Sequence, residues 1–136
     1  MNNCIFCKII KGEIPSFKIY EDEQTYAFLD ISKDCYGHTL VIPKQHYSDI
    51  FEIPEKALSS TIKTTKLICN HYKELGFEGA NIINNNSECA EQTINHLHFH
   101  IIPRNVNDGL KIFPSFTTKE INLEDAQKFL YKKSWH

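Results

Sequence analysis

The stretch His96-Leu97-His98-Phe99-His100-Ile101-Ile102 alternates histidine with apolar residues over its first five positions. Successive side chains of a β-strand point to opposite faces of a sheet, so this alternation predicts a strand over residues 97–102. The three histidines then share one face, with neighbouring side chains about 6.6 Å apart. The apolar residues between them share the other face, where they can enter a hydrophobic core.

Three interpretations of this histidine face remain open from the residues alone. It could be a polar face in contact with solvent, although Thr, Lys or Glu would serve as well there. It could be a three-histidine metal site. It could also hold a nucleophile supported by two imidazoles, because neutral histidine predominates at pH 7 and attacks without a separate base. Such a nucleophile needs its second nitrogen held as N–H, often by a backbone carbonyl.

The patterns on either side of this stretch predict an α+β fold in a single domain of residues 1–136. Apolar residues at three- and four-residue spacing predict one long helix over residues 55–75. Residues 122–132 predict a C-terminal helix with Asn122 as its cap, and residues 4–10 predict a helical turn or two. The other expected strands cover residues 17–21, 25–29, 39–42 and 80–83. This order predicts a mainly antiparallel five-stranded sheet.

Composition and charge exclude several classes of protein. The 136 residues are 41% hydrophobic with a net charge of −2, as in an ordinary globular domain. No run of Lys and Arg indicates a nucleic-acid partner, and no apolar run reaches membrane-spanning length. The five cysteines are an odd number, which excludes a complete disulfide framework, and the chain start lacks the features of a signal peptide. We therefore expect a reduced, cytoplasmic protein without a nucleic-acid or membrane partner.

Cys4 and Cys7 form a Cys-x-x-Cys pair, and its spacing alone leaves three interpretations open. The two residues could be small hydrophobes in an apolar turn. They could be a redox pair, although no thioredoxin-like βαβ pattern surrounds them. In a reducing compartment such a pair also serves as half of a metal site. The other three cysteines, Cys35, Cys69 and Cys89, are expected to be ordinary thiols.

The histidine run matches the signature of the histidine triad (HIT) family, His-φ-His-φ-His-φ-φ, where φ is apolar. Other segments resemble the same family in order along the chain: Cys4-Ile5-Phe6-Cys7-Lys8-Ile9-Ile10, Tyr26-Ala27-Phe28-Leu29-Asp30-Ile31-Ser32, Gly37-His38-Thr39-Leu40-Val41-Ile42-Pro43-Lys44, Asn84-Asn85-Asn86, Gln92-Thr93 and Pro103-Arg104. The resemblance covers most of residues 4–104 and is nearest to the Hint branch in its short bacterial-type form. It implies a HIT-like fold.

The resemblance also implies an activity. In this family the middle histidine, here His98, attacks the α-phosphorus of a nucleotide, and water then hydrolyses the nucleotidyl-histidine without a metal. His100 and His38 match positions that orient or stabilise the nucleophile. The implied enzyme is a nucleotide hydrolase of the nucleoside phosphoramidase type. The alternatives are a dinucleoside polyphosphate hydrolase, or a nucleotide- or zinc-binding regulatory module with little turnover.

The resemblance further implies a purine-nucleotide site. Phe28 and Ile31 match apolar walls of the purine pocket. Asp30 matches the acid that binds both ribose hydroxyls, and a carboxylate suits a diol because it only accepts hydrogen bonds. Asn85 and Thr93 match residues that contact the phosphate or ribose.

One residue of the expected phosphate loop departs from the family pattern. Glu91 stands where the family usually has Gly before Gln-Ser/Thr. Glycine allows a positive φ or a close approach of the backbone, and a glutamate adds negative charge near a phosphate. We therefore expect Glu91 to affect catalytic efficiency or substrate preference.

The resemblance gives the Cys-x-x-Cys pair a role in a structural zinc site. Short bacterial-type members with this opening hold zinc through the two cysteines, the histidine after Pro-Lys and the first triad histidine. The implied ligands are Cys4, Cys7, His46 and His96. Two thiolates and two imidazoles make a closed tetrahedral site.

Family members of the Hint type pair through the long helix and a strand, which implies a homodimer. The predicted helix over residues 55–75 carries small side chains among its apolar positions, at Thr61, Thr65 and Cys69. We expect these residues to allow close packing of a partner, unless this face only covers its own sheet.

Overall fold

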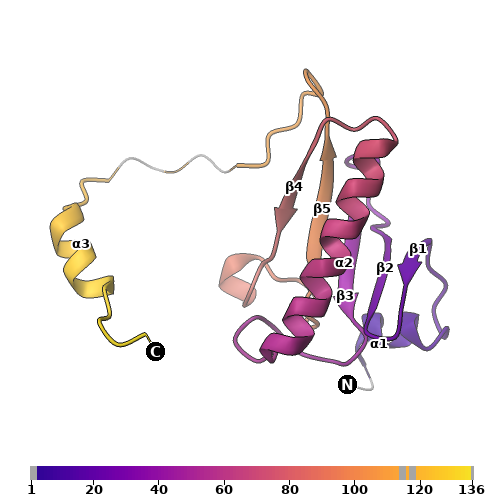
Figure 1. Cartoon of the computed structure of the whole chain (residues 1–136), viewed down its shortest axis with the longest axis horizontal. Helices are drawn as coiled ribbons and strands as arrows, with labels where there is room; N and C mark the ends of the chain where they lie inside the picture. Colours follow the sequence, from indigo (N-terminus) through magenta and orange to yellow (C-terminus); the bar gives the residue numbers. More distant parts are fainter. Residues whose placement is uncertain (1–2, 114–115, 117–118, 136) are drawn as a thin grey trace.

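In the computed structural model, which describes residues 3–113, 116 and 119–135, five strands form one antiparallel sheet in the order β1-β2-β3-β5-β4 (Figure 1). The strands are β1 (Lys18–Glu21), β2 (Thr25–Leu29), β3 (Thr39–Pro43), β4 (Gly79–Ile83) and β5 (Phe99–Arg104). The predicted α+β class and the antiparallel five-stranded sheet are therefore confirmed. That residues 1–136 form a single domain stays a prediction.

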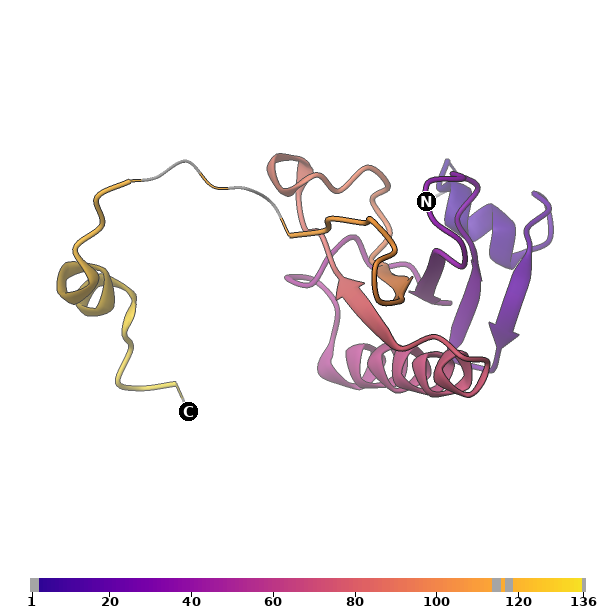
Figure 2. The same cartoon turned by 90° about the horizontal axis from the view of Figure 1, so that it is seen from above.

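The long helix α2 (Glu55–Glu74) covers one face of the sheet, and the short helix α1 (Ile5–Ile10) lies on the other side (Figure 2). The core beneath α2 includes Leu97, Phe99 and Ile101 together with residues of β2, β3 and α2. The apolar residues of the histidine run thus enter the core, as their alternation predicts. A second cluster lies under α1 and includes Phe6, Ile9, Tyr26, Phe28, Leu40 and Ile42.

The strand at the histidine run begins later than predicted. β5 starts at Phe99, which pairs with Val41 of β3, so His96, Leu97 and His98 precede the strand. Pairing with β3 stops at Val41, and the Leu97 N–H instead donates to the carbonyl of Tyr47 at 2.7 Å. The run is thus tied to the loop after β3 before it joins the sheet. A short 3₁₀ helix, η1 (Glu88–Ala90), was not predicted.

The expectation that Thr61 and Thr65 face a partner is wrong. Both residues are fully buried within the chain itself. The Thr61 hydroxyl donates to the Ala57 carbonyl at 2.8 Å, and the Thr65 hydroxyl donates to the Thr61 carbonyl at 2.9 Å. With their polar groups satisfied inside α2, these small residues let the helix lie close to its own sheet. Homodimer formation itself stays a prediction.

The predicted C-terminal helix is present as α3 (Leu123–Leu130). The Asn122 side chain caps it by accepting from the Asp125 N–H at 3.1 Å, as expected. No residue of α3 is buried, and Figure 1 shows the helix away from the sheet. Among the described residues, no helix combines the length and apolar character needed to cross a membrane.

Candidate functional site

His98 lies immediately before β5 and is only 4% exposed. Its Nδ1 is 2.7 Å from the carbonyl oxygen of His96. Because a carbonyl can only accept, Nδ1 carries the proton and Nε2 keeps a free lone pair. Burial lowers the pKa of His98, which keeps the ring neutral at pH 7. The side chain therefore has the tautomer and charge of a nucleophile.

Two residues that were not predicted as site residues hold His98 in place. The Asn84 side chain donates from Nδ2 to the carbonyl of His98 at 3.0 Å. The ring of Phe6 meets the His98 ring edge to face, with centroids 5.2 Å apart at an angle of 87°. Both residues belong to segments that resemble the family, but neither contact follows from sequence spacing.

Asp30, His38 and His100 form a second polar group beside the nucleophile. The Nε2 atom of His38 is 2.9 Å from Nδ1 of His100 and 3.8 Å from Oδ2 of Asp30. The other oxygen of Asp30 accepts from the Ser32 N–H at 2.7 Å. The ring centroids of His98 and His100 are 4.9 Å apart. Burial lowers the pKa of His100 to about 4, so this ring is also neutral at pH 7.

A cavity of about 300 Å³ opens onto His98 and His100. Six of the predicted site residues line it: Phe28, Asp30, Ile31, Thr93, His98 and His100. Ile31 is 86% exposed, so it lies at the rim rather than in the core. The helix α1 contributes Ile5, Phe6 and Ile9 to the apolar wall. This wall was not predicted, because its residues resemble an ordinary core pattern.

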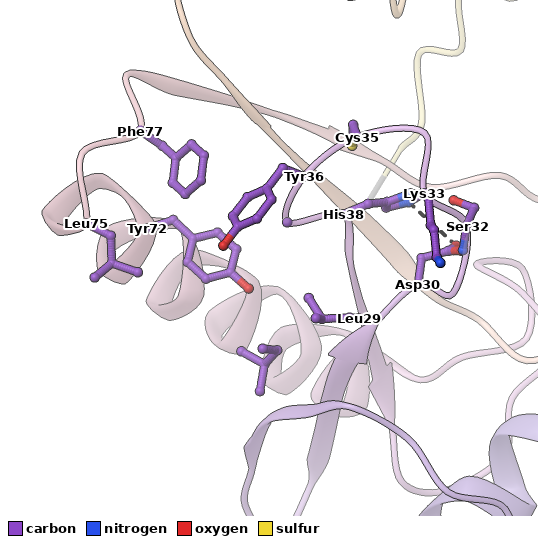
Figure 3. Close-up of a pocket in the computed structure, with 12 residues that line it drawn as sticks. Leu29, Asp30, Ser32, Lys33, Cys35, Tyr36, His38, Tyr72, Leu75 and Phe77 are labelled. Atoms are coloured by element: carbon purple, nitrogen blue, oxygen red, sulfur yellow. Dashed lines mark hydrogen bonds and ion pairs between the residues drawn. The ribbon is translucent and has the colours of Figure 1, made fainter.

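His38 lines a neighbouring cavity of about 490 Å³, next to the C-terminal end of α2 (Figure 3). Asp30 lines both cavities, so it lies between them. Figure 3 shows Asp30 and His38 facing each other, with Tyr36 and Tyr72 across the cavity. His38 thus contacts the nucleophile's cavity through His100 and Asp30, which both line it.

Asn85 is not among the residues that line the His98 cavity. Its two neighbours hold the loop: Asn86 donates to Asn84 Oδ1 at 2.6 Å and accepts from the Ile50 N–H at 2.7 Å. A contact between Asn85 and a nucleotide phosphate stays a prediction.

The loop before the histidine run is locked by Gln92. Its buried side chain accepts from the Ser87 N–H at 2.8 Å and donates to the carbonyls of Ser48 and Ile94 at 2.6 and 3.0 Å. The preceding residue, Glu91, is exposed and adopts φ = 68° and ψ = 26°. This positive φ is strained for a residue with a side chain, and glycine would adopt it without strain. An effect of Glu91 on catalysis stays a prediction.

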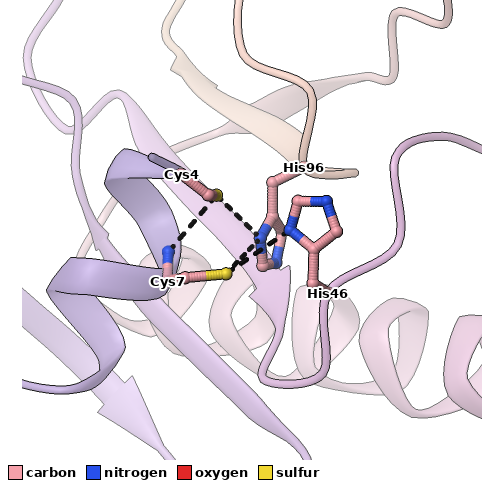
Figure 4. Close-up of side chains that lie close together, drawn as sticks. All are labelled: Cys4, Cys7, His46 and His96. Atoms are coloured by element: carbon pink, nitrogen blue, oxygen red, sulfur yellow. Dashed lines mark hydrogen bonds between the residues drawn. The ribbon is translucent and has the colours of Figure 1, made fainter. Parts of the chain in front are cut away.

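The four predicted metal ligands, Cys4, Cys7, His46 and His96, lie together (Figure 4). His96 Nδ1 is 3.4 Å from the Cys4 sulfur and 3.6 Å from the Cys7 sulfur, and His46 Nδ1 is 3.4 Å from the Cys7 sulfur. The His96 Nε2–H donates to the carbonyl of Pro43 at 2.8 Å. The lone pair of His96 Nδ1 therefore faces the two sulfurs.

This group fits a zinc ion. With Zn–S bonds of about 2.3 Å and Zn–N bonds of about 2.0–2.1 Å, a tetrahedral site places sulfur and nitrogen about 3.6 Å apart. The three sulfur–nitrogen distances of 3.4, 3.4 and 3.6 Å agree with that value. The ligands come from α1, the loop after β3 and the segment before β5, so a bound ion would join three parts of the chain.

Comparisons with known proteins agree with this geometry. A family model described as the HIT domain matches residues 11–107. The chain is 49% identical to an uncharacterized HIT-like protein of Methanocaldococcus jannaschii, over 92% of this chain and 96% of that one. It is 44% identical to an adenosine 5'-monophosphoramidase of Saccharomyces cerevisiae, over 96% and 82% of the two chains. It is 39% identical to an adenylylsulfatase of Arabidopsis thaliana, over 90% and 63%.

Solved structures of similar proteins share the fold. A HIT family protein from Bacillus anthracis matches with a TM-score of 0.82 and 45% identity, over 94% of this chain and 92% of that one. A zinc-bound histidine triad family protein from Mycobacterium smegmatis matches with a TM-score of 0.78 and 33% identity, over 93% and 89%.

Proposed function

The chain belongs to the HIT domain family, and we propose that it is a nucleotide hydrolase of the nucleoside phosphoramidase type whose nucleophile is Nε2 of His98. The observation that carries this proposal is the hydrogen bond from His98 Nδ1 to the carbonyl of His96, which leaves Nε2 free in a neutral ring. The relatives named as adenosine 5'-monophosphoramidase and adenylylsulfatase support a hydrolase that acts on adenylyl compounds.

In the proposed first step, Nε2 of His98 attacks the α-phosphorus and the bond from phosphorus to the leaving amine breaks. The amine takes up a proton from solvent, which the attacking water returns in the second step. The ring then carries the nucleotidyl group on Nε2 and a positive charge. The carbonyl of His96 accepts from Nδ1–H throughout, so it stabilises this charge without moving. In the second step water attacks the phosphorus, the P–N bond to the ring breaks, and neutral His98 is restored.

The cavity beside His98 is proposed to bind a purine nucleotide. Phe28 and Ile31 would contact the base, and Asp30 would accept from the ribose hydroxyls. Thr93 would donate to the phosphate from the rim, and Asn85 would do so from the loop after β4. His100, 4.9 Å from His98 between ring centroids, would orient the nucleophile together with His38.

Cys4, Cys7, His46 and His96 are proposed to hold a structural zinc ion. When bound, it would supply cross-linking rather than chemistry at the phosphate, because all four positions of a tetrahedral ion are filled by protein. Its effect on the site would be to fix α1, which carries Ile5, Phe6 and Ile9 of the cavity wall.

A second candidate function rests on Glu91. Its strained backbone and negative charge, one residue before the buried Gln92, favour a nucleotide- or zinc-binding regulatory module with little turnover. A dinucleoside polyphosphate hydrolase would use the same attack by His98 with a nucleotide as leaving group. Comparing rates on an adenosine phosphoramidate and on diadenosine polyphosphates separates these three functions.

We expect His98→Ala and His98→Asn to lower the rate of phosphoramidate hydrolysis by about 100-fold or more, because the attacking atom is removed. Asparagine keeps a donor for the carbonyl of His96, so this variant controls for loss of the orienting hydrogen bond. AMP affinity and melting temperature should stay close to wild type in His98→Asn. As a matched control, His71→Asn changes an exposed histidine of α2 and should leave the rate unchanged. Retention of more than a few per cent of the rate in both His98 variants would contradict the proposal.

A further inference from the structure

We propose that Asp30, His38 and His100 form a second metal site, which binds a divalent transition-metal ion such as Zn²⁺ and thereby blocks nucleotide binding. Each of the three side chains offers one ligand atom, and these atoms all lie within 4.8 Å of one another. The inhibitory part rests on the proposed function, because it uses Asp30 as the ribose ligand. The metal binding itself does not.

The three ligand atoms lie close together. Nε2 of His38 is the atom nearest to both partners, at 2.9 Å from His100 Nδ1 and 3.8 Å from Asp30 Oδ2. Two neutral imidazoles can share only one proton between these two nitrogens. An ion would replace that shared proton, since the ring that donates it can carry its proton on the other nitrogen instead. No proton has to be released.

The distances are close to those that an ion requires. Bonds of about 2.0–2.2 Å to nitrogen and oxygen place neighbouring ligands of a tetrahedral ion about 3.4 Å apart. One observed distance is shorter than this value and the other is longer. The remaining pair, Asp30 and His100, lies within 4.8 Å, so side-chain movements would bring all three atoms to bonding distance.

The ligands of this proposed second site differ chemically from the group of Cys4, Cys7, His46 and His96. Two imidazoles and one carboxylate, without sulfur, leave a coordination position open for water or a phosphate oxygen. Such a site binds more weakly than a closed site with two thiolates, so we expect the cysteine-containing site to fill first. All three groups are partly buried, which limits competition by water.

Occupancy of this site would stop nucleotide binding for a simple reason. Asp30 has one oxygen on the Ser32 N–H and only Oδ2 left toward the cavity. An ion on Oδ2 and a ribose diol would compete for the same atom. The ion would also hold His100, whose ring lies beside His98.

The test uses full-length protein that has been loaded with one equivalent of Zn²⁺ and is then titrated with Co²⁺. We expect one further Co²⁺ per chain, with visible d–d absorption but no thiolate charge-transfer band. His38→Asn and Asp30→Asn should each weaken this binding by at least about tenfold. His71→Asn and Cys89→Ser change exposed side chains and should leave it unchanged. Absence of a second equivalent, or its persistence in both Asp30→Asn and His38→Asn, would overturn the site.

Competition with AMP tests the inhibitory part separately. Saturating AMP should abolish binding of the second Co²⁺, and added Zn²⁺ should inhibit hydrolysis reversibly on addition of a weak chelator. If AMP binds to the Zn²⁺-loaded protein but does not displace Co²⁺, the inhibitory part is wrong and the metal site stands. If AMP itself does not bind, the proposed function fails while the Co²⁺ result remains interpretable.

Discussion

At the scale of single residues, His96 takes part both in the group with the two cysteines and in the hydrogen bond that orients His98. Its ring faces Cys4 and Cys7 through Nδ1, and its carbonyl oxygen accepts from His98 Nδ1. A change in the position of residue 96 would therefore affect both the proposed metal ligands and the proposed nucleophile. The first and second histidines of the run are buried, and the third is partly buried.

We expect replacement of Glu91 by glycine to raise both the stability of the fold and the catalytic rate. A left-handed backbone costs a residue with a side chain about 1–2 kcal/mol, and the entropy of glycine costs about 0.5–1 kcal/mol. Glu91→Gly should therefore stabilise the fold by about 0.5–1 kcal/mol in a denaturant titration. Removing a solvated negative charge, worth about 1 kcal/mol near a phosphate, should raise kcat/KM by about fivefold.

Two matched variants separate the causes in this experiment. Glu91→Gln removes the charge but keeps the side chain, and Glu88→Gln removes the charge of an exposed neighbour in η1. Slower turnover of Glu91→Gly only on a phosphoramidate with a cationic amine would show that Glu91 selects the leaving group, and the expected gain in rate would be wrong.

The sequence predicts the side chains of the candidate site. It is less informative about the neighbouring groups that hold those side chains in place. His98 and Asp30 line one cavity, and the four residues predicted as metal ligands lie together. The contacts of Phe6 and Asn84 with His98 were not predicted. They depend on how a helix from the chain start and a loop after β4 lie against the segment before β5, and no local pattern encodes that arrangement.

At the scale of elements, α1 is a helix of six residues, too short to be stable on its own. It is held by burial of Phe6 and Ile9 and by the cysteines at its start and in its first turn. A zinc ion would attach it to the loop after β3 and to the segment before β5. The cavity wall that α1 provides would thus depend on the ion.

We expect about one zinc ion per chain in protein prepared without chelator, and its loss in the double variant Cys4→Ser with Cys7→Ser. The melting temperature of that variant should fall by more than about 5 °C, and its AMP affinity should fall because α1 lines the cavity. The double variant Cys35→Ser with Cys89→Ser changes two cysteines outside the cluster and should keep the zinc. Elemental analysis that finds no metal in the wild type, or zinc that survives in the first variant, would contradict the ligand assignment.

The sequence predicts the bounds of the helices and strands closely. The exception is a bound that depends on pairing with a distant segment. The bounds of β2 and α2 agree with prediction to within one residue because a strand pattern and a helical repeat are local. The alternation of the histidine run predicts a start of β5 that is too early. The alternation already begins at His96, but pairing with β3 begins only at Phe99. Alternation reports which side chains are buried, but hydrogen bonding defines the strand.

At the scale of the whole molecule, β4, α2 and α3 each carry exposed apolar side chains. β4 is an edge strand, and its Ile82 is 48% exposed. On α2, Ile62 and Leu67 are 41% and 51% exposed. The helix α3 presents Leu123, Phe129 and Leu130 to solvent. An exposed edge strand can pair with another chain.

We expect a homodimer in which the two β4 edges take part, so light scattering at micromolar concentration should give a mass near twice the 15.8 kDa of the chain. Ile82→Lys should shift the mass toward that of a single chain, because lysine at an exposed edge opposes strand pairing. Ile19→Lys places the same change on β1, the opposite edge, and should leave the dimer intact. A wild-type mass near 15.8 kDa would refute the dimer.

The oxygen that holds His98 in its reactive tautomer belongs to the main chain. In a Ser-His-Asp triad the corresponding partner is a side chain, which a point mutation can delete. Here every amino acid at position 96 carries the same carbonyl, so scanning mutagenesis would identify the nucleophile and miss the group that orients it. A substitution at this position would remove a proposed zinc ligand, but it would leave this main-chain oxygen in place. The position of this carbonyl depends on the path of the backbone, which is fixed by the hydrogen bond from the Leu97 N–H to the Tyr47 carbonyl.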